Sequence, residues 1–281
     1  MNWNTTMYRL KNRKNETFIW KGKVIQVASK YTIGMINTNK FNTKMKIIEY
    51  RNCDDIDVQF LDSYGYIKKH VTTGAFKNGS IKNPYDVTVY GVGYLGVGEY
   101  NTWQNRKLTR EYETWKNMLR RCYSEEAKNI QRSYYGIATV CEEWKNFQNF
   151  ARWYNEHYYE VNERLHLDKD ILIPGNTIYS PKTCMLVPQS INEIFHGRTK
   201  DTNLPTGISK TKSGRYSASH ANNSLGTYKT LEEAYDAYAK DKERIIKQRA
   251  EEQKDIIPKY IYDVLCNYKV ELENDKYYQS A

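Results

Sequence analysis

Three side chains that can take part in acid–base or metal chemistry stand at alternate positions of one short segment: His166, Asp168 and Asp170. Alternate residues of a strand point to the same face, so a strand here would bring the imidazole and both carboxylates together. Carboxylate oxygens are suitable ligands for Mg²⁺, and imidazole titrates near neutral pH. Two of these groups also have an ordinary structural role open to them, because Asp168 would cap a turn and His166 would be a half-exposed strand histidine.

The segments around these residues predict short helices and strands. Apolar residues recur at three- and four-residue steps over residues 109–123 and 142–157, which predicts two amphipathic helices with aromatic residues on their buried sides. After them we expect a strand ending near 168–171, a turn at 174–176, a second strand over 183–187 and a short helix over 189–195.

The five cysteines are odd in number and widely spaced, which favours reduced thiols over a disulfide framework. Cys122, Cys141 and Cys184, with His166 or another residue, would offer a structural zinc site. Zinc ribbons normally carry paired C-x-x-C knuckles, and this sequence has none. Buried free thiols are therefore the favoured interpretation, with zinc as the alternative.

The first hundred residues are rich in strand-forming residues. Residues 45–51 and 55–60 predict two strands joined by a turn, within a meander or a small barrel. Residues 77–100 carry closely spaced glycines, which indicate a structured loop leading out of the domain. The strand-to-helix setting and the Lys-Ser/Thr pair of a phosphate-binding loop are missing there.

The composition favours a partner that carries phosphates. The chain of 281 residues has a net charge of +10 and 26 tyrosines. Basic side chains pair with phosphates and aromatic rings stack on bases, although codon usage in an AT-rich genome would also enrich Lys and Tyr. The sequence shows no apolar run of the length that spans a bilayer and no signal-peptide core, so we expect a cytoplasmic protein without a membrane partner.

Four signatures follow one another in a fixed order: TWKNMLRRCY (114–123), YYGIATVCEEW (134–144), LHLDKDILIPGNTIYSPKTCMLVP (165–188) and QSIN (189–192). This block resembles the phage and prophage proteins usually labelled HNH endonucleases. The resemblance implies a ββα-metal nuclease core that holds Mg²⁺ and a scissile phosphate between a hairpin and a helix.

Carried over residue by residue, the HNH resemblance makes Asp168 the first-strand carboxylate, Asn176 the middle asparagine and Asn192 the last metal ligand. The position of the general base is Lys169, whose ordinary pKa of about 10.4 keeps it protonated at neutral pH. The base is therefore missing from its usual place, and His166 is the candidate to replace it. Asp168, Asp170 and Asn192 are the candidate Mg²⁺ ligands.

Residues 207–253 read as three short strands and a long helix. The pattern G-I, G-R-Y-x-A, L-G-T-Y-x-T-x-E-E-A resembles the APETALA2-type DNA-binding domain, in which a three-stranded sheet lies in the major groove. On such a sheet Arg215 would pair with guanine, and Asn222 or Asn223 with adenine. The other candidate DNA contacts are Lys210, Lys212, His220 and Lys229. A solvated strand face that touches nothing is the alternative.

Together these features predict an α+β protein of several modules. The expected segments are a β-rich N-terminal domain (1–100), an HNH-like ββα module with flanking helices (101–198), an APETALA2-like sheet and helix (199–254) and a C-terminal helix or tail (255–281), with a polar linker at 198–204. We expect a phage-type protein that binds double-stranded DNA with a degenerate HNH core, and with Mg²⁺ it would be a site-specific or homing-type endonuclease. The alternatives are a non-catalytic DNA-binding regulator and a phage protein that binds and inhibits a host defence protein.

Overall fold

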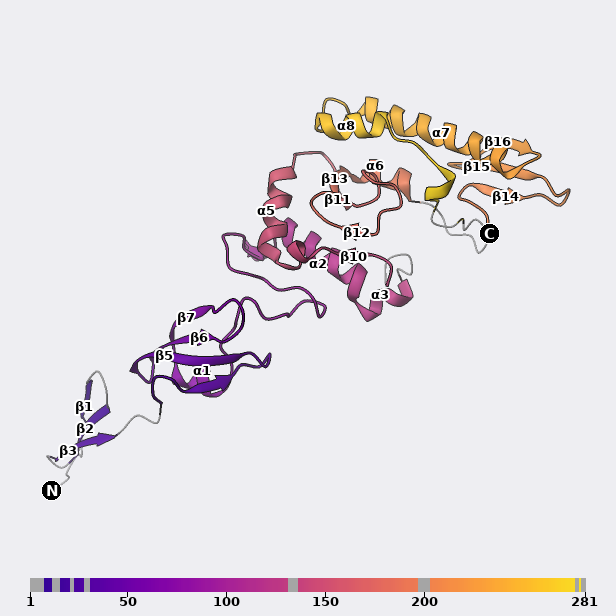
Figure 1. Ribbon diagram of the computed structural model, residues 1–281. Helices are drawn as coiled ribbons and strands as arrows, with labels where there is room; N and C mark the ends of the chain where they lie inside the picture. The colour runs from indigo at the N-terminus through magenta and orange to yellow at the C-terminus, as the bar shows by residue number, and fades with distance from the viewer. Residues whose placement is uncertain are drawn as a thin grey trace, which may run out of the picture. The chain divides into compact units, whose positions relative to one another are not determined.

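The computed structural model describes residues 8–11, 16–20, 23–27, 31–130, 136–196, 203–275 and 278. It divides into two compact units, Met1–Gly98 and Glu99–Ala281, each of which is described by itself. Helices and several small sheets make an α+β protein of several modules, as expected (Figure 1). The finer boundaries at 198 and 254 stay predictions, and residues 198–202 of the expected linker lie outside the described residues.

The first unit is built from two antiparallel sheets. One contains β1 (Tyr8–Lys11), β2 (Glu16–Trp20) and β3 (Lys23–Val27), and the other contains β4 (Ile36–Thr38), β5 (Lys44–Asn52), β6 (Asp55–Phe60) and β7 (Ile67–Val71). The second sheet is a meander, because its strands pair in chain order. Inward-facing residues such as Ile47 and Val58 alternate with outward ones along these strands, and α1 (Thr73–Lys77) adds Phe76 to their core.

The glycine-rich segment 77–100 is a structured loop, as predicted, and side-chain hydrogen bonds tie it to the second sheet and its turns. Asn39 donates to the Asp86 carboxylate, and Asn83 donates to the Asp62 carboxylate at 2.6 Å. Gly79 has a φ of +63°, and a Cβ there would lie 2.7 Å from the carbonyl oxygen of Thr38. A side chain at Gly79 would therefore collide with the backbone of β4.

The second unit begins with a short hairpin and a group of helices. These are β8 (Trp103–Gln104), β9 (Lys107–Leu108), α2 (Arg110–Tyr123), α3 (Glu125–Ile130), β10 (Thr139–Val140), α4 (Glu142–Lys145) and α5 (Phe147–His157). Trp115 and Met118 of α2 pack inside with Trp144 and Phe150, so the predicted apolar stripes are confirmed as core. The buried Trp115 indole donates to the carbonyl oxygen of Trp144 at 2.7 Å, which ties α2 to α4.

The prediction of a single helix over 142–157 is wrong, because the helix is interrupted at Asn146. The Asn146 side chain accepts a hydrogen bond from the backbone N–H of Gln148 at 2.9 Å, and its backbone is extended. An asparagine side chain competes with the helical hydrogen bonds in this way and favours an N-cap. The segment therefore forms α4 and then restarts as α5.

Strand, turn, strand and helix follow in the predicted order. They are β11 (Leu165–Asp168), the turn after it, β13 (Met185–Pro188) and α6 (Gln189–Phe195). The short strand β12 (Ile178–Tyr179) lies between β11 and β13 and was not predicted. β11 pairs with β13 in antiparallel register, with His166 opposite Val187, while β12 pairs in parallel with β10. The predicted short helix over 189–195 is confirmed to the residue.

The C-terminal part is a three-stranded sheet beside a long helix (Figure 1). It contains β14 (Ile208–Lys210), β15 (Tyr216–His220), β16 (Asn223–Tyr228), α7 (Leu231–Glu252), α8 (Lys259–Cys266) and η1 (Leu272–Asn274). Thr230 and Glu233 form a capping box that fixes the start of α7.

Helix α7 belongs to two cores. Its first half packs Ala234 and Tyr238 against the sheet, where Ala218 is buried. Its second half packs Ile246 and Ala250 into a cluster with β13, α6 and α8. The sheet and the ββα segment are therefore joined through one continuous helix.

Candidate functional site

His166 lies at the centre of a small polar row that joins β11 to α6. The Nδ2 amide group of Asn192 lies 2.9 Å from Nδ1 of His166 and 3.5 Å from Nε2 of His196. Asn192 is buried and His166 is half-buried, so the contact is shielded from water. An amide N–H that donates to Nδ1 leaves the proton of the neutral imidazole on Nε2. In this arrangement His166 presents a hydrogen-bond donor.

His166 also lines a pocket of about 190 Å³ between α2 and β11. We name it the arginine pocket, and its lining residues are Thr114, Asn117, Arg120, Arg121, Arg164, Leu165, His166 and Leu167. Arg120 and Arg164 are exposed, and Arg121 is half-buried with its guanidinium 5.6 Å from the centre of the Tyr179 ring. Three arginines and one histidine thus line a single concave site, and Arg164 also forms an ion pair with Glu113 at 3.8 Å.

The pKa of His166 is lowered from its ordinary range. Burial is the largest cause, and the charges of Arg164, His196 and Arg121 lower it further. A lowered pKa keeps the imidazole neutral at neutral pH. The positive charge of the arginine pocket therefore comes from its guanidinium groups.

Asp168 caps the turn after β11. Its Oδ1 accepts hydrogen bonds from the backbone N–H groups of Asp170 and Ile171, both at 2.7 Å. Burial and the charge of Asp170 raise its pKa to about 6. The structural role considered from the sequence is thus present in full.

Lys169 and Asn176 hold the two ends of the same loop together. The buried Lys169 ammonium donates to the Asp170 carboxylate and, at 2.8 Å, to the carbonyl oxygen of Asn176. The Asn176 side chain donates to the carbonyl oxygens of Lys169 and Ile178, both at 2.8 Å, and accepts from the N–H of Ile178. These hydrogen bonds hold the loop closed, and we name the two candidate catalytic residues Lys169 and Asn176 the loop clamp.

This arrangement does not fit Mg²⁺ at the residues that the resemblance implies. Asp168 uses Oδ1 in the turn, Asp170 is paired with Lys169, and the Asn192 amide contacts two imidazoles. A divalent cation needs ionised, available oxygen ligands, and an ammonium group on Asp170 competes with it. Mg²⁺ binding therefore stays a prediction.

Within the described residues, three potential metal ligands lie within mutual reach at one place, Asp55, Asp57 and His70 in the first unit. Arg51 occupies the middle of this group and donates to both carboxylates, with the Asp55 bond at 2.8 Å. Arg51 and His70 lower the pKa values of both aspartates. The group is an ion-pair network between β5, β6 and β7.

The three cysteines considered for zinc carry raised pKa values. Burial raises the pKa of the Cys122 thiol to about 11 and that of Cys184 to about 12, and it also raises the pKa of Cys141. Cys122 and Cys184 are buried and Cys141 is half-buried, and thiols that stay protonated need no metal. Zinc stays an untested alternative.

The candidate DNA contacts of the sheet divide between its two faces. Ile208 and Ala218 point toward α7, so Ser209, Ser217 and Thr227, which are paired in register, line the opposite face. Arg215 lies on that outer side and donates to the carbonyl oxygen of Thr227 at 3.1 Å, and the exposed Lys229 follows the end of β16.

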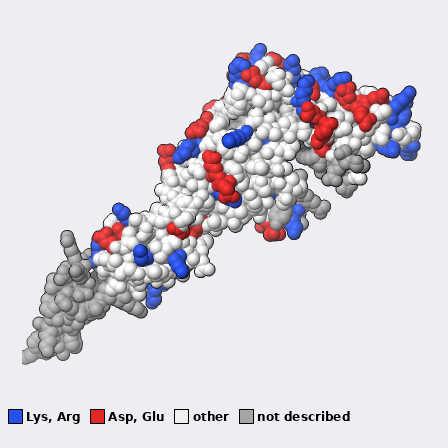
Figure 2. All heavy atoms as spheres, viewed as in Figure 1, with Lys and Arg blue, Asp and Glu red and all other residues white. Residues whose placement is uncertain are grey.

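The remaining candidates lie elsewhere on the sheet. Lys210 sits with its Nζ 5.9 Å from the centre of the Tyr216 ring, and His220 binds the Asp241 carboxylate on α7 at 2.9 Å. Lys212 is in the exposed β14–β15 turn, and Asn222 is at the tip of the next hairpin with a φ of 67°. Figure 2 shows Lys and Arg side chains gathered at the β14–β15 end of this unit, beside acidic side chains over α7.

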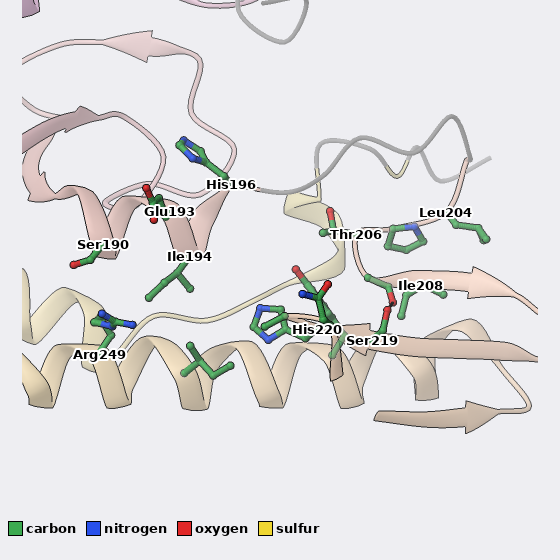
Figure 3. Close-up of a pocket in the computed structure, with 16 residues that line it drawn as sticks. Ser190, Glu193, Ile194, His196, Leu204, Thr206, Ile208, Ser219, His220 and Arg249 are labelled. Carbon is green, nitrogen blue, oxygen red and sulfur yellow. Dashed lines mark hydrogen bonds between the residues drawn. The ribbon is translucent and has the colours of Figure 1, made fainter. Parts of the chain in front are cut away.

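A second pocket, of about 530 Å³, lies between α6, the sheet and α7. Figure 3 shows Glu193 and His196 of α6 on one side of it and His220 of β15 on the other, with Arg249 reaching up from α7. His196 therefore lines this pocket and also contacts Asn192. Helix α6 is shared by the row around His166 and by the wall that faces the sheet.

Sequence reasoning missed the convergence around His166. The helical stripe of residues 109–123 leaves Arg120 and Arg121 on the accessible side, but nothing in the pattern connects them to Arg164, which is more than forty positions further along the chain. His196, one turn after Asn192, was a readable signal, because residues four apart share a helix face.

Comparison with known proteins does not assign the chain to a family. No protein-family model matches the chain, and neither the curated proteins nor the solved structures give a significant match. Within the described part of the chain, no helix has both the length and the apolar character that crossing a membrane requires.

Proposed function

We propose that this protein binds double-stranded DNA through its second unit and holds a backbone phosphate in the arginine pocket. The observation that carries the proposal is that three arginines, Arg120, Arg121 and Arg164, line one concave site together with His166. Guanidinium groups pair with phosphate oxygens through charge-assisted hydrogen bonds. With its proton on Nε2, His166 adds a neutral donor to the same phosphate.

The outer face of the sheet supports a second contact on the same DNA. It carries the hydroxyl groups of Ser209, Ser217 and Thr227 with Arg215 at one end. Small polar side chains allow a sheet to approach base edges closely, and an arginine at its end reaches guanine. Because α7 packs both on this sheet and in the core that contains β13 and α6, the two contacts belong to the same compact unit.

Hydrolysis of the bound phosphodiester is the second candidate function. The lowered pKa of His166 favours it, because a neutral imidazole is the form that accepts a proton from water. The acceptor must then be Nε2, which requires Nδ1 to carry the proton and the Asn192 amide to turn its oxygen toward it. The Asn192 amide turns its Nδ2 toward both imidazoles, and this orientation supports binding without cleavage. On this proposal the protein is a phage-type DNA-binding protein that acts in the cytoplasm of its host.

The experiment combines a gel shift with a plasmid-cleavage assay. Wild type, an Arg120→Ala/Arg164→Ala double variant and an Arg152→Ala control are mixed with duplex DNA at low salt. Arg152 is an exposed arginine on α5 outside the arginine pocket. We expect the double variant alone to lose affinity. Equal affinity of all three proteins would contradict the phosphate contact.

The cleavage assay compares Mg²⁺ with EDTA on plasmid DNA. We expect bound but intact plasmid in both conditions. Nicking that depends on Mg²⁺ and is lost in His166→Ala would instead establish hydrolysis, with His166 as the base. Absence of duplex binding at low salt would reject both functions and leave the inhibitor of a host protein as the remaining interpretation.

A further inference from the structure

The first unit carries a stack of tyrosines on its surface. The rings of Tyr64 and Tyr85 lie parallel, with centroids 3.9 Å apart and an interplanar angle of 5°. The hydroxyl groups of Tyr64 and Tyr94 are 3.0 Å apart and share a hydrogen bond. We name Tyr64, Tyr85 and Tyr94 the tyrosine platform. It joins the β6–β7 turn to the glycine-rich loop.

Hydrogen bonds fix the backbone beneath the tyrosine platform. Oδ1 of Asp62 accepts from the N–H groups of Tyr64 and Gly65 at 3.0 and 2.9 Å, which closes the β6–β7 turn. Oδ2 of the same carboxylate accepts from Asn83, two residues before Tyr85. One side chain therefore holds both segments, and the stacked rings need little further ordering to accept a ligand.

The outer ring of the stack faces solvent. Tyr64 is 52 % exposed, whereas the neighbouring Tyr66 packs against the core of the unit. A large aromatic side chain that is rigidly held outside the core is typical of a binding surface. Each of the two segments has an exposed lysine close by in the sequence, Lys68 two residues after Tyr66 and Lys82 three residues before Tyr85.

We propose that the tyrosine platform binds an unpaired base of single-stranded nucleic acid. The Tyr64–Tyr85 stack ends in an exposed ring, and a flat base laid on that ring continues the stack. Every base has a π-face, so this contact carries little sequence preference, and lysines beside such a stack hold the backbone phosphates. The inference goes beyond the proposed function, since it concerns the other unit and the unpaired form of the nucleic acid.

The test measures fluorescence anisotropy of the full chain with a labelled oligothymidylate of about 16 nucleotides and with an abasic strand of the same length. We expect Tyr64→Ala to bind the oligothymidylate about 5- to 150-fold more weakly than wild type, and Tyr64→Trp to bind it at least as well. The matched control is Phe41→Ala, because Phe41 is 53 % exposed in the same unit and should leave binding unchanged.

Two results would overturn the proposal. One is equal binding of the oligothymidylate by wild type and Tyr64→Ala. The other is equal binding of the oligothymidylate and the abasic strand by wild type. This second comparison uses wild type alone, so it does not depend on whether a variant folds. Duplex DNA is measured alongside, and its affinity should stay the same in the Tyr64 variants. Loss of the single-strand contact is thereby separated from failure of duplex binding by the second unit.

Discussion

Asn176→Ala distinguishes a loop clamp from a catalytic asparagine. The substitution removes two hydrogen bonds that the amide donates and one that it accepts. Each such bond contributes about 0.5–1.5 kcal/mol net, and a buried carbonyl left without a partner costs about 1–3 kcal/mol. Lys169 is buried while Ile178 is exposed, so water replaces some partners but not all of them. We expect a loss of about 2–4 kcal/mol in the free energy of unfolding.

The assay is urea unfolding followed by the fluorescence of the buried tryptophans Trp115, Trp144 and Trp153, which belong to the second unit. A loss of this size lowers the urea midpoint by about 1–2 M. Asn155→Ala is the matched control, because it removes one bond on the surface of α5 and should change stability by less than about 0.5 kcal/mol. An unchanged midpoint in Asn176→Ala, with DNA binding or cleavage lost, would refute the clamp.

Three further predictions concern the buried Asp168 carboxyl, the outer face of the C-terminal sheet and helix α7. The pKa of Asp168 is about 6 in the folded state against 3.8 for a free aspartate, so the folded state binds this proton more tightly than the unfolded state. The protonated carboxyl therefore stabilises the fold below pH 3.8, and this stabilisation is lost as pH rises through 6. In urea unfolding, Asp168→Asn should remove up to about 3 kcal/mol of this pH dependence of the free energy of unfolding. Arg215→Ala should cost about 1–3 kcal/mol at one base position while Lys212→Ala weakens all sequences alike, and uniform losses from both in a binding-site selection would make Arg215 a phosphate contact. Deleting residues 207–253 should unfold the second unit, because α7 contributes Ile246 and Ala250 to the core under α6, and retained near-ultraviolet circular dichroism would contradict this.

Local pattern in the sequence predicted most of the secondary structure. The helix expected over 109–123 begins one residue later, and the helix over 189–195 is confirmed, because the period of apolar residues fixes both. The break at Asn146 was missed, since a side chain that caps a helix competes with periodicity and leaves the apolar stripe intact.

The candidate site was harder to read from the sequence. Alternation predicted a shared face for His166, Asp168 and Asp170, and β11 does carry His166 and Asp168 at half-buried alternate positions, but the strand ends at Asp168 and leaves Asp170 in the turn. The contact of His166 with Asn192 depends on how α6 packs on the hairpin, and the arginine pocket depends on how α2 packs on β11. Such packing of distant segments leaves no periodic signal. For Asn176 the resemblance supplied a catalytic role, while its hydrogen bonds assign it to the loop.

The salt dependence of duplex binding tests the central claim most directly. Each phosphate contact contributes about 0.9 to the slope of log Kobs against log salt concentration. The arginine pocket holds one phosphate, so the Arg120→Ala/Arg164→Ala variant should give a slope shallower than wild type by up to about 0.9, while Arg152→Ala keeps the wild-type slope. A double variant with the wild-type slope, or a wild type that binds no duplex at low salt, would contradict a phosphate in the arginine pocket.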